Sequence, residues 1–247
     1  MTADFPQTRA ALEKIPAWVN QLAETLPPPV LVPFGPGRRW EHEKRDPLVA
    51  QVAKAVRLAT ALRASLVLAD AGLTTEAHSL LRIVGDINGE IQMLAEALVA
   101  GRLTKEQEDF LNQFFESLPL RPEELAAKEP VRFVGRGVVA KAVARLFKGP
   151  RSATEKHARG VAYLNTGYDR YVHAKYSTAM ELFNGQHFML TGSDFPQQVR
   201  ETKVAVAGKT VESVQSLRLM AKIRRLERLG GEIRATEVAV MGEHESA

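Results

Sequence analysis

Acid–base chemistry is concentrated in one stretch of the chain, TGYDRYVHAKYSTAMELF at residues 166–183. Asp169 and His173 are four residues apart, so a helix places them on the same face. A carboxylate beside a histidine fixes the tautomer of the ring and favours its protonated form, an arrangement common in general bases. The same spacing is also common in ion pairs on helix surfaces. Two interpretations therefore stay open, a catalytic pair and a surface pair.

A second row of ionisable residues lies in LLRIVGDINGEIQML, where Arg82, Asp86 and Glu90 follow each other at intervals of four. A helix places them on one face, next to its apolar side. Charged groups near a core must be paired and hydrogen-bonded. The helix at 166–183 is expected to supply partners, so the sequence predicts a polar network between the two helices. Its expected members are Arg82, Asp86, Glu90, Tyr168 and Tyr171.

Positive charge is unevenly distributed, although the formal net charge is only +4. Residues 130–154 contain six basic residues and no acidic residue. A cluster of this kind suits a polyanion such as RNA, whose phosphates are bound without sequence readout. A solvated helix surface is the alternative interpretation. The candidate nucleic-acid-binding residues are Arg132, Arg136, Lys141, Arg145 and Lys148.

Several kinds of site are excluded or disfavoured by composition. The chain has no cysteine, which excludes disulfides, thiolate metal sites and a cysteine nucleophile. Its six histidines are scattered, so we expect no metal site and no cofactor. No window approaches the roughly 20 apolar residues of a membrane span, and no secretory signal is evident. We therefore expect a cytoplasmic protein that has no membrane association.

Helical periodicity dominates the chain and predicts an all-α fold. Pro47 suits a helix start and Gly72 a helix stop, and Thr104 with Gln107 forms a capping box. A proline-rich arm follows the first helix and is expected to be extended and held to the surface by Phe34 and Trp40, while Pro16 is expected to end or kink the first turn. Helices are expected at 7–26, 47–72, 74–100, 104–118, 137–147, 152–165, 166–183 and 197–229.

The short connection at Gly72 predicts that the two longest early helices form an antiparallel hairpin, on which a helical bundle is built. Gly230 and Gly231 are expected to end the last helix. The predicted organisation is an N-terminal helix and irregular Pro-rich arm at 1–46, a bundle domain at 47–231 and a flexible tail at 232–247.

TEAHSLLRIVGDINGEIQML and YLNTGYDRYVHAKYSTAMELF together resemble a group of uncharacterised bacterial helical proteins with an LLR…E helix and a later Y…Y.H helix. That group is similar to the HEPN superfamily (higher-eukaryote and prokaryote nucleotide-binding domains). The resemblance covers about residues 47–230, and its matched positions are Arg82, Glu90, Tyr168, Tyr171 and His173. It implies a HEPN-like helical bundle and a homodimer.

Many HEPN proteins are metal-independent ribonucleases, so the resemblance also implies an RNA-cleaving site in stress or phage defence. Their motif is an arginine, four to six residues and a histidine. Arg151 and His157 have this spacing, but Ser152 stands where a typical member has Asn, Asp or His. Arg170 and His173 are separated by only two residues, which departs from the motif.

Two hypotheses follow from these observations. The first is a HEPN-like, RNA-associated protein, with ribonuclease residues among His173, Asp169, Arg170, Arg151 and His157. The second is a non-catalytic helical dimer or adaptor, in which the polar network is structural. The expected partners are a second copy of the chain, RNA or another polyanion, and a cognate protein.

Overall fold

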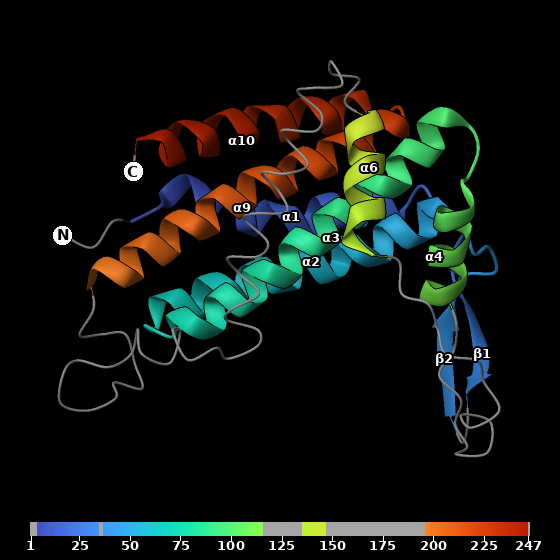
Figure 1. The fold of residues 1–247 in the computed structure, drawn as a ribbon, viewed down its shortest axis with the longest axis horizontal. Helices are drawn as coiled ribbons and strands as arrows, with labels where there is room; N and C mark the ends of the chain where they lie inside the picture. The colour runs from blue at the N-terminus through green and yellow to red at the C-terminus, as the bar shows by residue number, and fades with distance from the viewer. Residues whose placement is uncertain (1–3, 35–36, 116–134, 147–195, 247) are drawn as a thin grey trace.

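The secondary structure of the protein is almost entirely helical. The computed structural model describes residues 4–34, 37–115, 135–146 and 196–246, which contain seven helices and one two-stranded sheet. The all-α class predicted from the sequence is confirmed. With the labels of Figure 1, the elements are α1 (Pro6–Ala23), β1 (Val30–Phe34), β2 (Gly37–Glu41), α2 (Pro47–Asp70), α3 (Thr74–Ala100), α4 (Lys105–Phe115), α6 (Arg136–Leu146), α9 (Pro196–Ile223) and α10 (Glu227–Glu245).

Helices α2 and α3 pack side by side in opposite directions, and both ends of α2 follow from local sequence (Figure 1). The carboxylate of Asp46 accepts a hydrogen bond from Val49 N at 3.0 Å, which caps the first turn, and Pro47 opens the helix. At the other end Gly72 has a φ of 75°, and Leu73 N donates to Leu68 O at 2.8 Å. This Schellman turn reverses the chain into α3.

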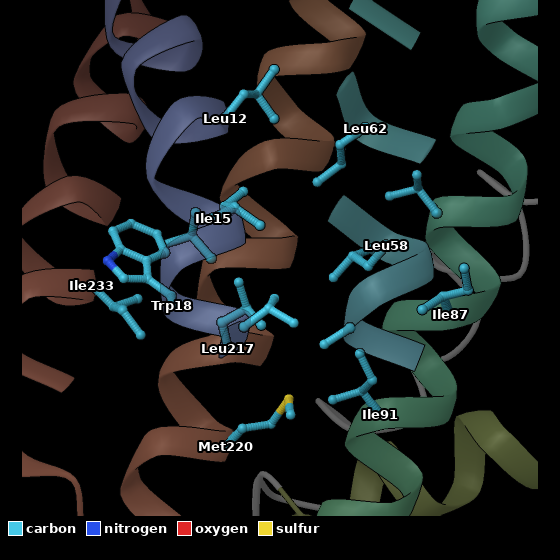
Figure 2. Close-up of a cluster of buried hydrophobic side chains, with 14 of the residues drawn as sticks. Leu12, Ile15, Trp18, Leu58, Leu62, Ile87, Ile91, Leu217, Met220 and Ile233 are labelled. Atoms are coloured by element: carbon cyan, nitrogen blue, oxygen red, sulfur yellow. The ribbon is translucent and has the colours of Figure 1, made fainter. Parts of the chain in front are cut away.

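The main core lies where α1, α2, α3, α9 and α10 meet. Figure 2 shows Leu217 and Met220 of α9 facing Leu58 of α2 and Ile91 of α3, with Trp18 on the far side of α9. A second apolar cluster joins the N-terminal end of α2 to the C-terminal half of α3, α4 and α6. None of the described helices has both the length and the apolar character needed to cross a bilayer.

Three expectations for the N-terminal region are wrong. Pro16 does not end α1, because Ile15 and Trp18 are both buried and hold the helix to the core on either side of it. The proline-rich arm is an antiparallel hairpin, β1–β2, rather than irregular chain. Pro33 is tolerated there because a two-stranded sheet consists only of edge strands. Trp40 does not hold the arm to the surface, since 68% of it is exposed.

The expected end of the last helix and the flexible tail are also wrong. Helix α9 ends at Ile223, and the chain then forms a further helix, α10, across Gly230 and Gly231. The turn between them is a Schellman motif in which Leu226 N donates to Ala221 O at 2.9 Å. Arg225 takes the left-handed position with a φ of 56°, at a cost of roughly 1–2 kcal/mol. Leu226 packs against the main core and offsets this strain.

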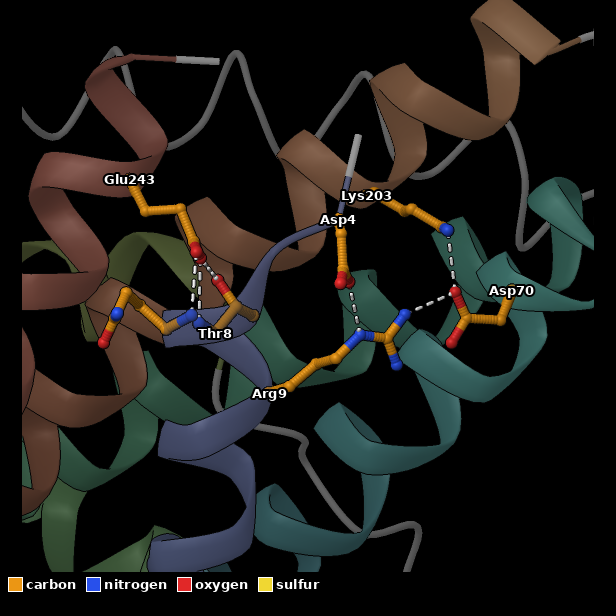
Figure 3. A network of polar contacts seen from close by, with 7 residues as sticks. Asp4, Thr8, Arg9, Asp70, Lys203 and Glu243 are labelled. Carbon is orange, nitrogen blue, oxygen red and sulfur yellow. Dashed lines mark hydrogen bonds and ion pairs between the residues drawn. The ribbon is translucent and has the colours of Figure 1, made fainter. Parts of the chain in front are cut away.

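Helix α10 is held to the start of α1 by a carboxylate. Residue Phe5 offers no side-chain cap, so the N–H groups of Gln7 and Thr8 have no acceptor within α1. Glu243 accepts from both of them at 2.7 and 2.8 Å, and from the Thr8 hydroxyl at 2.6 Å, as Figure 3 shows. A negative charge at this position also interacts favourably with the dipole of α1.

An ion cluster beside this cap joins α1, α2 and α9 (Figure 3). Asp70 accepts from Arg9 Nη2 and from Lys203 Nζ, each at 2.8 Å. Partial burial raises the pKa of Asp70, but the hydrogen bonds from Arg9 and Lys203 outweigh burial and leave this pKa below its ordinary value. The cluster therefore favours the ionised carboxylate and joins the three helices at this end of the bundle.

Replacing Gly231 by Ala tests whether residues 227–245 are helical. A Cβ added at Gly231 meets no atom within 4 Å, so alanine should gain about 0.5–1 kcal/mol of stability from its higher helix propensity. The melting temperature should rise by a few degrees, measured by circular dichroism. Gly101→Ala is the control, because its φ of 66° disfavours alanine and should lower the melting temperature. A loss of stability in Gly231→Ala would show that α10 does not continue through this residue.

Replacing Glu243 by Ala removes the acceptor of two N–H groups of α1. The free energy of unfolding should fall by about 1–2 kcal/mol, which lowers the melting temperature by several degrees in a chain of this size. Glu245→Ala is the matched control, because this exposed residue lies on the same turn of α10. Equal melting temperatures of the two variants would contradict the capping role of Glu243.

Candidate functional site

The predicted pair Arg82–Asp86 forms on α3. Arg82 is 2% exposed, and its Nη1 makes an ion pair with Asp86 one turn later. Asp86 is half-exposed and also lies 3.5 Å from Arg136 Nε of α6. The pair thus extends from the core to the surface at the crossing of α3 and α6. Its buried guanidinium is not placed to bind a ligand from solvent.

Glu90, the third member of the predicted row, is paired with α2. Its Oε2 lies 2.6 Å from Lys54 Nζ, and both side chains are mostly buried. The Lys54 ammonium also lies 5.4 Å and 5.0 Å from the ring centroids of Phe110 and Phe114 of α4. These distances are within the range of cation–π attraction. One lysine therefore joins α2, α3 and α4.

Two further polar residues, on another side of α3, contact α9. Asn88 Nδ2 donates to Ser213 Oγ at 3.0 Å, and Gln92 Nε2 donates to Ser216 Oγ at 3.2 Å. The two serine hydroxyls in turn donate to backbone carbonyls one turn earlier in α9, at 2.7 and 3.1 Å. We call these polar residues of α3 (Arg82, Asp86, Asn88, Glu90 and Gln92) with their partners the α3 seam. Its hydrogen bonds connect helices.

Gln51 and Arg224 close one end of the α3 seam. Gln51 Nε2 donates to Ile91 O at 3.0 Å, and Arg224 Nη1 donates to Gln51 Oε1 at 3.1 Å. Arg224 Nη2 also donates to Leu48 O at 3.0 Å. Burial lowers the pKa of Arg224 to about 10, so the guanidinium stays charged at neutral pH. This cation ties the C-terminal end of α9 to the N-terminal end of α2.

Helix α6 crosses α3 and carries the described part of the basic block (Figure 1). Ala142 and Val143 are buried, and Val139 packs over Gly89 of α3. A Cβ added at Gly89 would lie 2.8 Å from Val139 Cγ1, so the glycine permits this close approach. Because these apolar residues face α3, the basic side chain of Lys141 points away from it. The other basic residues of α6 are Arg136 and Arg145.

The arginines of α6 are oriented by carboxylates of α3. Arg145 Nε donates to Glu96 Oε1 at 2.8 Å, and Gln107 Nε2 donates to Glu96 Oε2 at 2.7 Å. The hydrogen bond from Arg145 lowers the pKa of Glu96, partial burial opposes this, and the net shift is downward. Arg136 makes a longer ion pair with Asp86, at 3.5 Å. Both arginine side chains remain about half exposed, at 54% and 50%, and Lys141 is exposed as well.

The other predicted site residues lie outside the described residues. The ribonuclease and network assignments at these positions stay predictions. In the part of the chain that the structure describes, no three side chains from His, Asp and Glu are grouped to hold a metal ion. The positions concerned are Arg132, Lys148, Arg151, His157, Tyr168, Asp169, Arg170, Tyr171 and His173.

Sequence reasoning missed several members of the α3 seam. Ser213 and Ser216 interrupt the apolar side of α9, and Asn88 and Gln92 lie four residues apart on α3. Each pair is about one helical turn apart, so the sequence could have predicted that the two pairs meet, because buried polar residues require partners. Lys54 gave no such signal, since a lysine on a helix is usually solvated.

Comparison with known proteins adds no relative. No protein-family model, curated protein or solved structure matches the chain.

Replacing Arg82 by Ala should destabilise the protein strongly. The change removes a buried side chain and leaves Asp86 without its partner on α3. We expect a loss of about 2–3 kcal/mol, less than for a fully buried pair because Asp86 is half-exposed. Urea denaturation should show it as a lower midpoint. Arg63→Ala, on the exposed side of α2, is the control and should stay within about 0.5 kcal/mol of wild type. An unchanged midpoint in Arg82→Ala would rule out a structural role for the pair.

Proposed function

We propose that this protein is a helical RNA-associated module that binds RNA phosphates through α6. The observation that carries the proposal is the exposure of three basic residues, Arg136, Lys141 and Arg145, on a helix that contains no acidic residue. Phosphates are bound by such cations without sequence readout.

The ion pairs of the two arginines are compatible with this role. A guanidinium has five donors in a planar fork, and Glu96 accepts from only Nε and Nη2 of Arg145. The half-exposed Arg145 therefore keeps donors for a phosphate while its carboxylate partner holds it in place. Lys141 adds a mobile, strongly hydrated charge between them.

The arrangement of the α3 seam favours binding over catalysis for the described residues. Arg82, Glu90, Asn88 and Gln92 are occupied by contacts with their own or neighbouring helices. These contacts support a structural role for the seam, as the adaptor hypothesis requires. The proposal therefore combines the helical module with RNA binding, and RNA cleavage remains a separate hypothesis about residues 151–173.

Fluorescence anisotropy with a labelled single-stranded RNA tests the binding proposal. Affinity should fall steeply between about 50 and 200 mM salt, because bound phosphates release counterions. Lys141→Gln should weaken binding several-fold at low salt and reduce the salt slope by about 0.7, the value for one contact to a single strand. Arg63→Gln carries the same charge change on α2 and should bind like wild type.

Absence of binding at low salt, or equal binding by Lys141→Gln and wild type, would refute the proposal and leave the adaptor hypothesis. The same RNA, incubated with wild type, His157→Ala and His173→Ala, tests cleavage. Loss of cleavage in one variant would identify the catalytic histidine. Binding without cleavage by wild type would exclude the ribonuclease hypothesis for that substrate.

A further inference from the structure

The β1–β2 hairpin projects away from the helices at the end of the molecule where α4 lies (Figure 1). Its register pairs Leu31 with Trp40 and Pro33 with Arg38. Side chains alternate between the faces of a strand, so these four residues share one face. We call it the Trp40 face.

The Trp40 face exposes an unusual amount of apolar surface. Trp40 is 68% exposed and Leu31 is 44% exposed, whereas the other tryptophan, Trp18, is 1% exposed in the core. A single exposed leucine requires no explanation, but an exposed indole on a projecting hairpin is typical of a recognition surface. The face offers a flat aromatic ring to a partner.

The carboxylate of the hairpin and its ion pairs lie on the face opposite Trp40. Glu41 lies on the opposite face, where it pairs with Arg39 and, at 3.9 Å, with Arg45. The Trp40 face contains one charged residue, Arg38, and no carboxylate. Arg38 and Trp40 are two positions apart on one strand, or about 6.7 Å, which is on the scale of one nucleotide.

A second copy of the chain is a poor occupant of this face. Four residues cover far less than the roughly 800 Å² per partner of a standard protein interface. A polymer that offers both a flat ring and a negative charge fits better.

We infer that the Trp40 face binds single-stranded RNA, with a base stacked on Trp40 and its phosphate bound by Arg38. The inference rests on the proposed function for the identity of the polymer and adds a second contact, distinct from α6. Base–aromatic stacking requires an unpaired base, because the bases of a duplex are already stacked. The hairpin therefore selects single strands, whereas α6 binds phosphates of either form.

Titration with oligouridylate tests the inference. Stacking should quench the fluorescence of Trp40, and a duplex of the same length should not. Trp40→Ala should weaken binding of the single strand by about 5- to 100-fold, the range for one stacked base, and Trp40→Phe should retain most of the affinity. Val238→Ala, an equally exposed apolar truncation on α10, is the matched control and should bind like wild type.

The outcomes separate this inference from the proposed function. If Lys141→Gln weakens binding and Trp40→Ala does not, RNA binding by the hairpin is refuted and RNA binding by α6 is supported. If Trp40→Ala weakens binding and Lys141→Gln does not, RNA binding by the hairpin is supported and RNA binding by α6 is refuted. The inference is overturned if oligouridylate does not bind. It is also overturned if Trp40→Ala leaves RNA affinity unchanged but alters the oligomeric state, measured as molecular mass by light scattering. Should Trp40→Ala fail to fold, the presence or absence of quenching in wild type decides.

Discussion

The structure depends on one constraint, which is that the polar side chains of α3 lie among other helices and must be satisfied there. An unpaired polar group costs far more in a core than at the surface, because water no longer compensates it. Each neighbour of α3 meets this requirement with a different chemistry. Helix α2 offers the ammonium of Lys54, α9 offers two serine hydroxyls, and α6 offers the guanidinium of Arg136.

These contacts specify how the helices fit together, whereas the apolar core alone tolerates alternatives. Apolar surfaces attract without direction, so a helix could rotate or slide against its neighbour at little cost. A hydrogen bond such as that from Asn88 to Ser213 requires one register of α3 against α9. The register of α3 in turn sets Gly89 beneath Val139 and thus the position of α6. The outward direction of Lys141 follows from contacts on the opposite side of its helix.

Groups that are available to a ligand are therefore found at the edge of the α3 seam or outside it. The basic side of α6 and the Trp40 face are both exposed. In each case the other side of the same helix or hairpin makes contacts within the protein. The arginines of α6 are held by carboxylates of α3, and Arg39 is held by Glu41 behind Trp40. Side chains that are oriented before binding lose less entropy when a ligand arrives. The proposed RNA contacts use these two surfaces, one by charge and the other by stacking.

Local sequence determined the helical class, the limits of α2 and α3, and the capping box of Thr104 and Gln107, because each depends on residues within a few positions of one another. It also determined the pair Arg82–Asp86, which lies within one helix. Tertiary structure alone decided that the chain turns at Arg225 rather than at Gly230, since burial of Leu226 outweighs the local preference for glycine. It also decided that Glu90 pairs with Lys54 and that Glu243 caps α1, because those partners are distant in sequence and only packing brings them together.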